Sequence, residues 1–152
     1  MKHILFVCLG NICRSPMAEY YMRHIVALNG LDGIITVSSA AISNEEEGNP
    51  VYPPARKKLN ANGIDCNGKT ARQIRPDDYD RYDLIIVMDS SNMRSILPRM
   101  GGDPQGKIHK LLDFTGTTGD IADPWYTRDF DRAWRDITRG CDALLSFLRQ
   151  EL

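Results

Sequence analysis

Apolar residues along the chain follow two alternating patterns. Short, nearly continuous apolar runs bounded by turn residues predict buried strands over residues 3–7, 34–38, 83–88 and 107–111. The run at 83–88 is apolar throughout after Asp83, which is typical of a parallel strand covered on both faces. We therefore expect four strands in one buried sheet.

The segments between these runs carry apolar residues at helical spacing. They predict helices over residues 16–30, 55–62, 90–97 and 130–148, with Pro16 at the first helical position and Pro98 ending the third helix. The last helix has the longest stripe: Phe130, Ala133, Trp134, Ile137, Cys141, Leu144, Leu145 and Leu148. Such a stripe is typical of core packing, so no chemical role is expected for it. Long loops are expected over residues 43–54 and 113–128.

Strands and helices alternate along the whole chain. This order predicts a single α/β domain, residues 1–152, in which helices cover both faces of a four-stranded parallel sheet. Sheets of this kind bind ligands beyond the carboxyl ends of their strands. The first strand ends at Cys8, so we expect a site in the loop that follows it.

Composition and charge exclude several classes of protein. Of 152 residues, 26% are charged and 42% are hydrophobic, as in globular domains, and a formal net charge of −1 gives no basic field for nucleic acid. No apolar run approaches the ~18 residues of a membrane span, and the N-terminal apolar stretch ends at Leu9 without a cleavage pattern. We expect a cytoplasmic, intact chain that binds neither nucleic acid nor a membrane.

The cysteines and histidines are scattered. Cysteines at positions 8, 13, 66 and 141 are too few for a disulfide framework and lack the spacing of zinc ligands, and histidines at 3, 24 and 109 add no pair. The sequence therefore predicts no metal site and no cofactor.

The segment 8–16, with the sequence CLGNICRSP, joins the first strand to the first helix. A turn of this kind aims backbone N–H groups and the positive end of the helix dipole at one point, which favours a phosphate. Gly10 and Asn11 tolerate the left-handed conformations that curl these amides inward. Beside the helix N-terminus and Arg14, Cys8 is expected to be a thiolate, and Arg14 offers a planar fork for two phosphate oxygens.

A strand-to-helix turn with a buried cysteine and a solvated arginine is the alternative interpretation of this segment. The spacing Cys-x5-Arg occurs by chance in many proteins. Its placement between a strand and a helix started by proline, with Ser15 able to cap the helix or to donate to Cys8, favours the phosphate site.

Phosphoryl transfer from an oxygen ester also needs a proton donor for the leaving group. Asp123 is the candidate, because it lies in the long loop before the last helix and is followed by Pro124, which stiffens the chain. Trp125 and Tyr126 come next and are expected to wall a slot for a flat aromatic ring. By itself Asp-Pro is equally typical of an ordinary turn.

The chain resembles the low-molecular-weight protein tyrosine phosphatase family, in its bacterial form. The resemblance covers the whole chain and is carried by residues 8–16, Ser39-Ala40, Ala71-Arg72-Gln73, Val87-Met88-Asp89 with Ser91-Asn92, and Asp123-Pro124-Trp125-Tyr126. It implies a sheet in the order 2-1-3-4. It also implies hydrolysis of phosphotyrosine in proteins, and of aryl phosphates, with Cys8 as the nucleophile that forms a phosphocysteine, Arg14 as the phosphate clamp and Asp123 as the general acid and base.

The same resemblance extends to the rest of the segment. It implies that the phosphate is bound or the loop is shaped by Leu9, Gly10, Asn11, Ile12, Cys13 and Ser15. The partner is then a phosphotyrosine-containing protein, and the enzyme itself is expected to be a monomer or weak dimer that needs no metal.

The sequence departs from the family in two places. The loop after the second strand, Ser43 to Glu47, has no aromatic residue, so we expect Asn44 and Glu45 to form a polar, acidic wall of the pocket. Taken alone, Glu45–Glu47 is more typical of a solvated surface. Lys69 stands where many members carry a histidine that supports the loop asparagine. Both departures bear on substrate preference.

A second phosphate-binding pattern occurs at residues 63–70, where GIDCNGKT satisfies the Walker A pattern. A true loop of that type follows a buried strand and opens a helix. Here a polar helix end precedes Gly63, and Pro76 leaves little room for a helix afterwards. The segment is therefore expected to be a helix end followed by a turn.

Other proteins with a Cys-x5-Arg loop have different activities, and each of those activities is associated with residues that differ from the ones in this chain. An arsenate reductase of this fold needs further cysteines to resolve the first, and Cys66 and Cys141 are not paired that way. An arginine phosphatase tends to carry threonine at Ile12, and a sugar-transport phosphocarrier needs no Asp123. Cys13 lies in the same loop as Cys8, so we expect oxidation to join them in a reversible disulfide. The alternative is that Cys13 only fills space under the loop.

Overall fold

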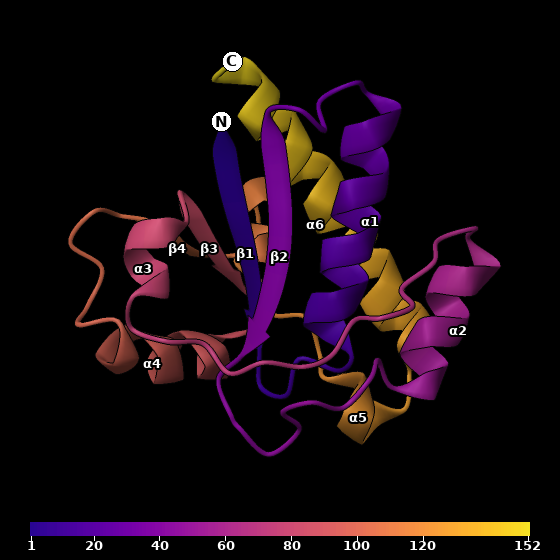
Figure 1. Ribbon diagram of the computed structural model, residues 1–152. Coiled ribbons are helices and arrows are strands. Elements are labelled where there is room, and N and C mark those ends of the chain that lie inside the picture. The colour runs from indigo at the N-terminus through magenta and orange to yellow at the C-terminus, as the bar shows by residue number, and fades with distance from the viewer.

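The computed structural model describes residues 1–152 and contains a four-stranded parallel sheet in the order β2-β1-β3-β4 (Figure 1). The strands are β1 (Lys2–Cys8), β2 (Ile35–Ala41), β3 (Leu84–Val87) and β4 (Ile108–Lys110). β1 pairs with β2 on one side and with β3 on the other, so the first strand is central. The predicted sheet and its order are confirmed.

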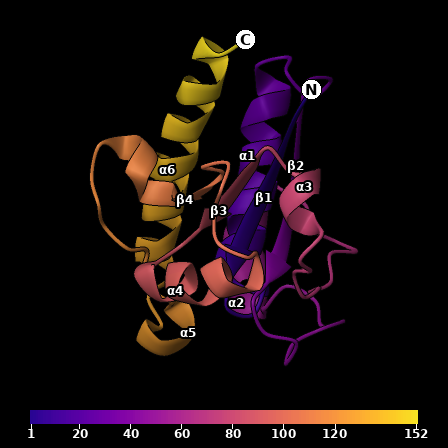
Figure 2. The ribbon, with the colours of Figure 1, turned by 90° about the vertical axis from the view of Figure 1, so that its left-hand side faces the viewer.

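Helices cover both faces of this sheet (Figures 1 and 2). The larger layer consists of α1 (Arg14–Leu28), α2 (Pro53–Ala61) and α6 (Phe130–Gln150), and the smaller layer of α3 (Asp78–Arg81) and α4 (Ser90–Arg99). The short helix α5 (Pro124–Thr127) lies beyond the carboxyl ends of the strands. None of the helices is long and apolar enough to cross a membrane.

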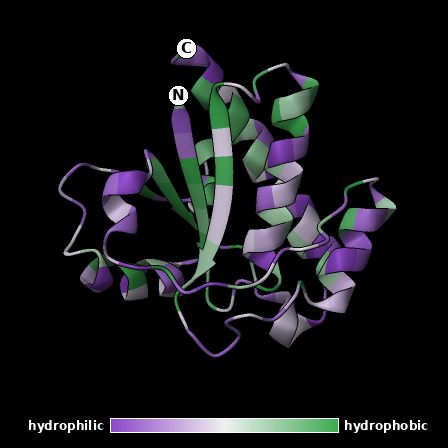
Figure 3. Cartoon of the chain, in the orientation of Figure 1, coloured by the Kyte–Doolittle hydropathy of each residue, from purple (hydrophilic) through white to green (hydrophobic).

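The central strand divides the core into two parts. Ile4 and Phe6 belong to a cluster of 26 buried residues under α1, α2 and α6, whereas Leu5 and Val7 belong to a cluster of 11 under α3 and α4. All four side chains are fully buried, because successive residues of a strand point to opposite faces. Figure 3 shows β3 in green, β2 paler along much of its length, and helices that carry both green and purple residues.

The boundaries of the four predicted helices each differ from the prediction by one or two residues, and those of α1 and α4 have a clear physical reason. Helix α1 begins at Arg14, two residues before Pro16. The proline is tolerated there because the first backbone N–H groups of a helix have no partner in the helix. Helix α4 continues through Pro98 to Arg99, since a proline this close to the end interrupts little and Met100 N–H still donates to the carbonyl of Ile96.

The predicted loop 113–128 was wrong in part. It contains α5, and a 3-10 helix over Leu111–Thr115 overlaps its beginning. Asp123 caps α5 by accepting from the N–H of Trp125, and Pro124 occupies the first helical position, so the signals were those of a helix start. Helix α3 was not expected, because four residues are too short to give a periodic pattern.

Candidate active site

The loop from Cys8 to Ser15, called here the 8–15 loop, connects the carboxyl end of β1 to α1. The Cys8 sulfur accepts a hydrogen bond from the backbone N–H of Asn11 at 3.3 Å and lies 3.0 Å from the Ser15 hydroxyl. The sulfur therefore lies close to the N-terminus of α1, where both groups, together with the helix dipole, stabilise negative charge.

Asn11 holds the curled conformation of this loop. Its φ angle is 59°, in the left-handed region, and it is 1% exposed. Its amide nitrogen donates to the hydroxyls of Ser15 and Ser39 at 2.8 and 2.9 Å, and its amide oxygen accepts from the N–H of Arg72 at 3.2 Å. The side chain thus satisfies its own polar groups while it fixes a backbone shape that few residues adopt. Gly10, expected to share this role, does not have a positive φ.

A buried ion pair lies beneath Asn11. The Glu19 carboxylate, whose side chain is 3% exposed, accepts from the Ser39 hydroxyl, lies 3.4 Å from the Lys69 ammonium, and pairs with Arg23 at 2.6 Å. Lys69 also donates to the Ser39 carbonyl at 3.1 Å. Burial lowers the pKa of Lys69, and the attraction of Glu19 acts in the opposite direction. A chain of polar contacts therefore runs from Lys69 to the Cys8 sulfur.

Arg14 is 2% exposed and is held by three groups that come from distant parts of the chain. Its Nη1 donates to Asp89 at 2.6 Å and to the Ile121 carbonyl at 2.8 Å, and its Nη2 lies 3.3 Å from Asp123. Burial alone would lower the pKa of Arg14, but Cys8, Asp123 and Asp89 outweigh it and raise that pKa, which keeps the guanidinium charged. The Nε atom has no hydrogen-bond partner within the protein, so its N–H remains available to a ligand in the cavity that Arg14 lines.

Asp123 lies at the start of α5, next to Arg14. Its Oδ2 faces the guanidinium and its Oδ1 accepts from the Trp125 N–H at 3.0 Å. Trp125 and Tyr126 on α5 are 39% and 74% exposed, and the Trp125 ring lies 4.8 Å from the ring of Tyr52. The acid candidate is thus anchored to the arginine on one side and carried by a lightly attached helix on the other.

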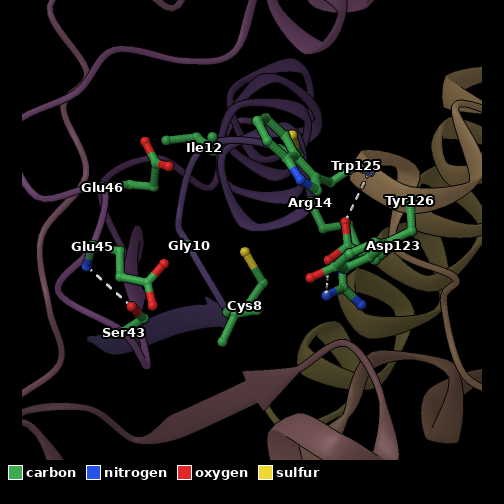
Figure 4. A pocket seen from close by; sticks show the side chains of 12 residues that line it. Cys8, Gly10, Ile12, Arg14, Ser43, Glu45, Glu46, Asp123, Trp125 and Tyr126 are labelled. Atoms are coloured by element: carbon green, nitrogen blue, oxygen red, sulfur yellow. Dashed lines mark hydrogen bonds and ion pairs between the residues drawn. The ribbon is translucent and has the colours of Figure 1, made fainter.

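These residues surround one cavity of about 150 Å³ at the carboxyl end of β1 (Figure 4). It is lined by Cys8, Leu9, Gly10, Ile12, Cys13, Arg14, Ser43, Glu45, Glu46, Asp123, Trp125 and Tyr126. Figure 4 shows Glu45 and Glu46 on one side of Cys8, and Asp123 and Trp125 on the other. The cavity is therefore acidic on one wall and aromatic on the opposite wall, with the sulfur between them.

The cavity brings together most of the residues expected from the sequence, but three do not line it. Asn11 and Ser15 are buried within the loop and contact the Cys8 sulfur from there. Asn44 is exposed, in a turn where its carbonyl accepts from the Glu47 N–H, and the neighbouring Ser43 and Glu46 line the cavity instead. The expectation of a merely solvated acidic run was also incomplete, since Glu45 and Glu46 line the cavity.

Several groups that hold the site were not identified as such from the sequence. Asp89, Ser39 and Arg72 belong to motifs already noted, but Glu19 gave only a weak signal, an acidic residue on the buried face of an otherwise amphipathic helix. Nothing in the local pattern indicated that Lys69 would reach it across 50 residues.

The Walker-like segment forms no phosphate site. Gly63, with a φ angle of 73°, follows the end of α2, and the next helix begins only at Asp78. The ammonium of Lys69 points to Glu19 and Ser39 rather than to a loop of amides. The expected helix end and turn are confirmed.

The four cysteines are free, and no group of three or more His, Cys, Asp or Glu residues is arranged to hold a metal ion. Cys13 is buried in a small cluster with Ile12 and Ala71. Burial, together with the nearby Cys8, raises the pKa of the Cys13 thiol. Cys141 is fully buried in the main core, as its place on the apolar stripe predicts.

Comparison with known proteins identifies the class to which this fold and cavity belong. Residues 3–152 match the family model described as low molecular weight phosphotyrosine protein phosphatase. The chain is 40% identical over 153 residues to the low molecular weight protein-tyrosine-phosphatase YfkJ of Bacillus subtilis, covering 99% of this chain and 98% of that protein. The crystal structure of YfkJ superposes with a TM-score of 0.96, covering 99% and 96% of the two chains.

More distant relatives agree with this class. A low molecular weight phosphotyrosine protein phosphatase of Gallus gallus is 36% identical, covering 95% of this chain and 94% of that protein. The crystal structure of a Drosophila arginine phosphatase is 29% identical, with a TM-score of 0.86 and coverage of 97% and 98%. The fold and the matches define a protein-tyrosine-phosphatase, which is a hydrolase. The chain belongs to the low molecular weight phosphotyrosine protein phosphatase family.

Proposed function

We propose that this protein hydrolyses phosphotyrosine in proteins, and simple aryl phosphates, in two steps through a phosphocysteine on Cys8. The observation that carries the proposal is that the Cys8 sulfur, Arg14 and Asp123 line one cavity with an aromatic wall. The oxygens of a phosphate placed over the sulfur can accept hydrogen bonds from backbone N–H groups of the 8–15 loop and from the free Nε of Arg14. These donors supply the charge that phosphoryl transfer needs, so no step requires a metal.

In the first step the Cys8 thiolate attacks phosphorus, an S–P bond forms and the P–O bond to the tyrosine oxygen breaks. In the structure Arg14 Nη2 donates to Asp123 Oδ2 at 3.3 Å, and when phosphate is bound it can donate to a phosphate oxygen instead. Asp123 Oδ2 is then free to carry the proton that it gives to the departing oxygen.

In the second step a water molecule attacks the phosphocysteine. Asp123 accepts a proton from that water, and the water oxygen forms a bond to phosphorus. The S–P bond breaks, which releases inorganic phosphate and the Cys8 thiolate. The Ser15 hydroxyl, 3.0 Å from the sulfur, stabilises the thiolate as it leaves. The same carboxyl group therefore serves as acid and then as base.

The decisive experiment measures turnover of p-nitrophenyl phosphate and of a phosphotyrosine peptide by the wild type, Cys8→Ser and Cys66→Ser, with excess chelator. Cys66 is a buried cysteine outside the cavity and serves as the matched control. We expect Cys8→Ser to lose nearly all activity while Cys66→Ser and the chelator leave it largely intact. Substantial turnover by Cys8→Ser would contradict the covalent route.

Substrate class is tested separately, because one structural relative is an arginine phosphatase. The apolar Ile12 side chain and the aromatic wall of Trp125 favour a flat, uncharged leaving group over a guanidinium. We expect kcat/KM for the phosphotyrosine peptide to exceed that for a phosphoarginine peptide of the same sequence. The reverse order would assign the site to arginine.

Redox control of the same cavity is also proposed. Peroxide should convert Cys8 to its sulfenic acid, which Cys13 then attacks to form a disulfide and water. Because burial raises the pKa of Cys13, we expect this closure to be slow at neutral pH and faster as the pH rises. After peroxide and then reductant, the wild type should regain more activity than Cys13→Ser. Equal recovery would remove the role of Cys13.

A further inference from the structure

Arg128, which ends α5, has an unusual backbone conformation. Its φ angle is 61°, and Asn11 is the only other non-glycine residue with a positive φ. Glycine adopts this region without steric cost and asparagine tolerates it, whereas a long side chain such as arginine is seldom found there. In Asn11 the conformation shapes the 8–15 loop. For Arg128, the contacts of its side chain account for the conformation.

The guanidinium of Arg128 contacts two aromatic rings. Its Nη1 donates to the Tyr52 hydroxyl at 2.9 Å, and its Cζ lies 6.0 Å from the centre of the Tyr52 ring and 5.4 Å from that of Trp125. Tyr52 and Trp125 themselves lie 4.8 Å apart. The arginine therefore joins the acid-bearing segment to the residue that precedes α2.

This contact is the only hydrogen bond that ties residues 124–128 to another element. The other hydrogen bonds of α5 are local: three N–H groups donate to Asp123, and the N–H of Arg128 donates to the Pro124 carbonyl. The Asp129 N–H also donates to the Thr127 hydroxyl at 3.1 Å, where the chain passes into α6. Without Arg128, the end of α5 that is distant from Arg14 would therefore have no hydrogen bond to any residue before Asp123 in the chain.

Tyr52 is in turn fixed to the 8–15 loop. Its backbone N–H donates to the carbonyl of Ile12 at 2.9 Å, and its ring stacks at 6.2 Å on Phe130. A continuous path therefore leads from the loop that carries Cys8, through Tyr52 and Arg128, to the helix that Asp123 caps. The two reacting groups are linked by a route that does not pass through Arg14.

We propose that the Arg128–Tyr52 contact sets the position of Asp123 relative to the Cys8 sulfur, so that Arg128 and Tyr52 are positioning residues for proton transfer to the leaving group. The inference rests on the proposed function, in which Asp123 is the acid. Proton transfer is sensitive to displacements of a fraction of an ångström, whereas an exposed contact of this kind adds little to overall stability. Loss of the contact should therefore affect proton transfer and leave the fold intact.

The test compares Arg128→Gly and Tyr52→Phe with the wild type on aryl phosphates whose phenols range from acidic, needing no proton, to tyrosine-like. Arg128→Gly relieves the backbone while it removes the guanidinium, and Tyr52→Phe removes only the hydroxyl. Arg132→Ala, at an exposed arginine at the start of α6, is the matched control.

We expect kcat/KM to fall about tenfold for the tyrosine-like phenol in Arg128→Gly, part of the 10²–10⁴ that a positioned acid supplies. The most acidic phenol should lose less than about twofold, with the melting temperature unchanged or higher. Tyr52→Phe should show the same trend more weakly, and Arg132→Ala none. Equal losses for all phenols, or a loss that follows a lowered melting temperature, would overturn the inference.

Asp123→Asn measured in the same series separates this inference from the proposed function. If Asp123→Asn shows no dependence on the leaving group, the acid itself is wrongly assigned. If Asp123→Asn shows a steep dependence and Arg128→Gly shows none, the acid stands and only the positioning role fails.

Discussion

At the scale of single residues, the site depends on buried polar groups that are all paired. Asn11, Ser15, Ser39 and Glu19 are each no more than 2% exposed, and no buried side-chain nitrogen or oxygen lacks a hydrogen bond. A buried polar group without a partner costs more free energy than a formed hydrogen bond contributes. The network under the 8–15 loop is therefore expected to be sensitive to the loss of any member.

Lys69 is the member that the sequence least explained. In Lys69→Met the side chain keeps its apolar length but loses the ammonium that lies 3.4 Å from Glu19. We expect the free energy of unfolding to fall by about 1–3 kcal/mol, because Glu19 keeps Arg23 and Ser39 but loses one partner. The kcat on aryl phosphate should fall with it as Asn11 loosens. Urea titration and turnover measure the two effects.

Lys57→Met supplies the control for that change, since Lys57 is an exposed lysine on α2. It should change the free energy of unfolding by no more than about 0.5 kcal/mol, the usual range for an exposed position, and leave kcat unchanged. If Lys69→Met behaves like Lys57→Met, the ion pair does not support the loop.

At the scale of elements, the closest approach between α6 and the 3-10 helix occurs at a small residue, Gly140. A Cβ atom on Gly140 would lie 2.5 Å from Cγ of Leu111, which is fully buried. The glycine therefore permits a close approach that no other residue allows without rearrangement.

Gly140→Ala tests this packing. Alanine favours a helix interior over glycine by about 1 kcal/mol, but overpacking a core costs about 1–3 kcal/mol. We expect the melting temperature to fall, and Leu111→Ala combined with Gly140→Ala to be less destabilised than the sum of the two single changes. A more stable Gly140→Ala protein would show that Leu111 moves aside at no cost.

The turn that leads into β4 carries a pH-dependent contribution to stability. Burial by itself would raise the pKa of Asp103, but hydrogen bonds from the Tyr79 hydroxyl and from the N–H groups of Lys107 and Ile108 together lower it below its usual 3.8. Because the folded pKa is the lower one, the stabilisation is present above the unfolded pKa and is lost as the pH falls through the folded value.

The free energy of unfolding of the wild type should therefore fall below about pH 4, near the unfolded pKa of aspartate. Asp103→Asn, which keeps one acceptor oxygen and has no charge to lose, should be less stable at neutral pH and show a shallower fall in acid. Denaturant titrations between neutral pH and the acid limit measure both slopes, and parallel curves would contradict the role of Asp103.

At the scale of the whole molecule, the mouth of the cavity is acidic although its ligand is an anion. Glu45 and Glu46 line it, and the glutamates found in ion pairs are Glu19 and Glu151, so the charges at the mouth are not neutralised. A phosphate dianion entering the cavity must pass these carboxylates. Basic residues next to a phosphotyrosine would meet them favourably.

The double variant Glu45→Gln with Glu46→Gln should raise kcat/KM for a small aryl phosphate about threefold to tenfold at low salt. The two changes remove the repulsion between the carboxylates and the phosphate dianion, which act on each other through several ångströms of water. The same variant should lose kcat/KM on a phosphotyrosine peptide flanked by lysines. Both differences should shrink as salt is added. Glu151→Gln changes a residue next to the C-terminus, and Figure 1 shows the C-terminus at the opposite end of the molecule from α5; it should change kcat/KM for neither substrate. Effects that do not depend on salt would point away from charge.

The sequence by itself determined the four strands, the last helix and the 8–15 loop, and it singled out Cys8, Arg14 and Asp123, which the structure places in one cavity. These features depend on neighbours in the chain: a strand or helix has a local period, and a phosphate loop needs one strand, one turn and one helix start in succession. Short elements such as α3 and α5, with four residues each, escaped prediction because they are too short for a period to show.

Only the tertiary structure decided which side chains hold that chemistry in place. Arg14 meets Asp89 across 75 residues and Asp123 across 109, Glu19 meets Lys69, and Arg128 meets Tyr52 across 76. Contacts between residues so far apart in the chain leave no local pattern, because they arise when the sheet brings the carboxyl ends of its strands to one edge. The sequence supplied the groups proposed to react, and the fold determined the distances between them.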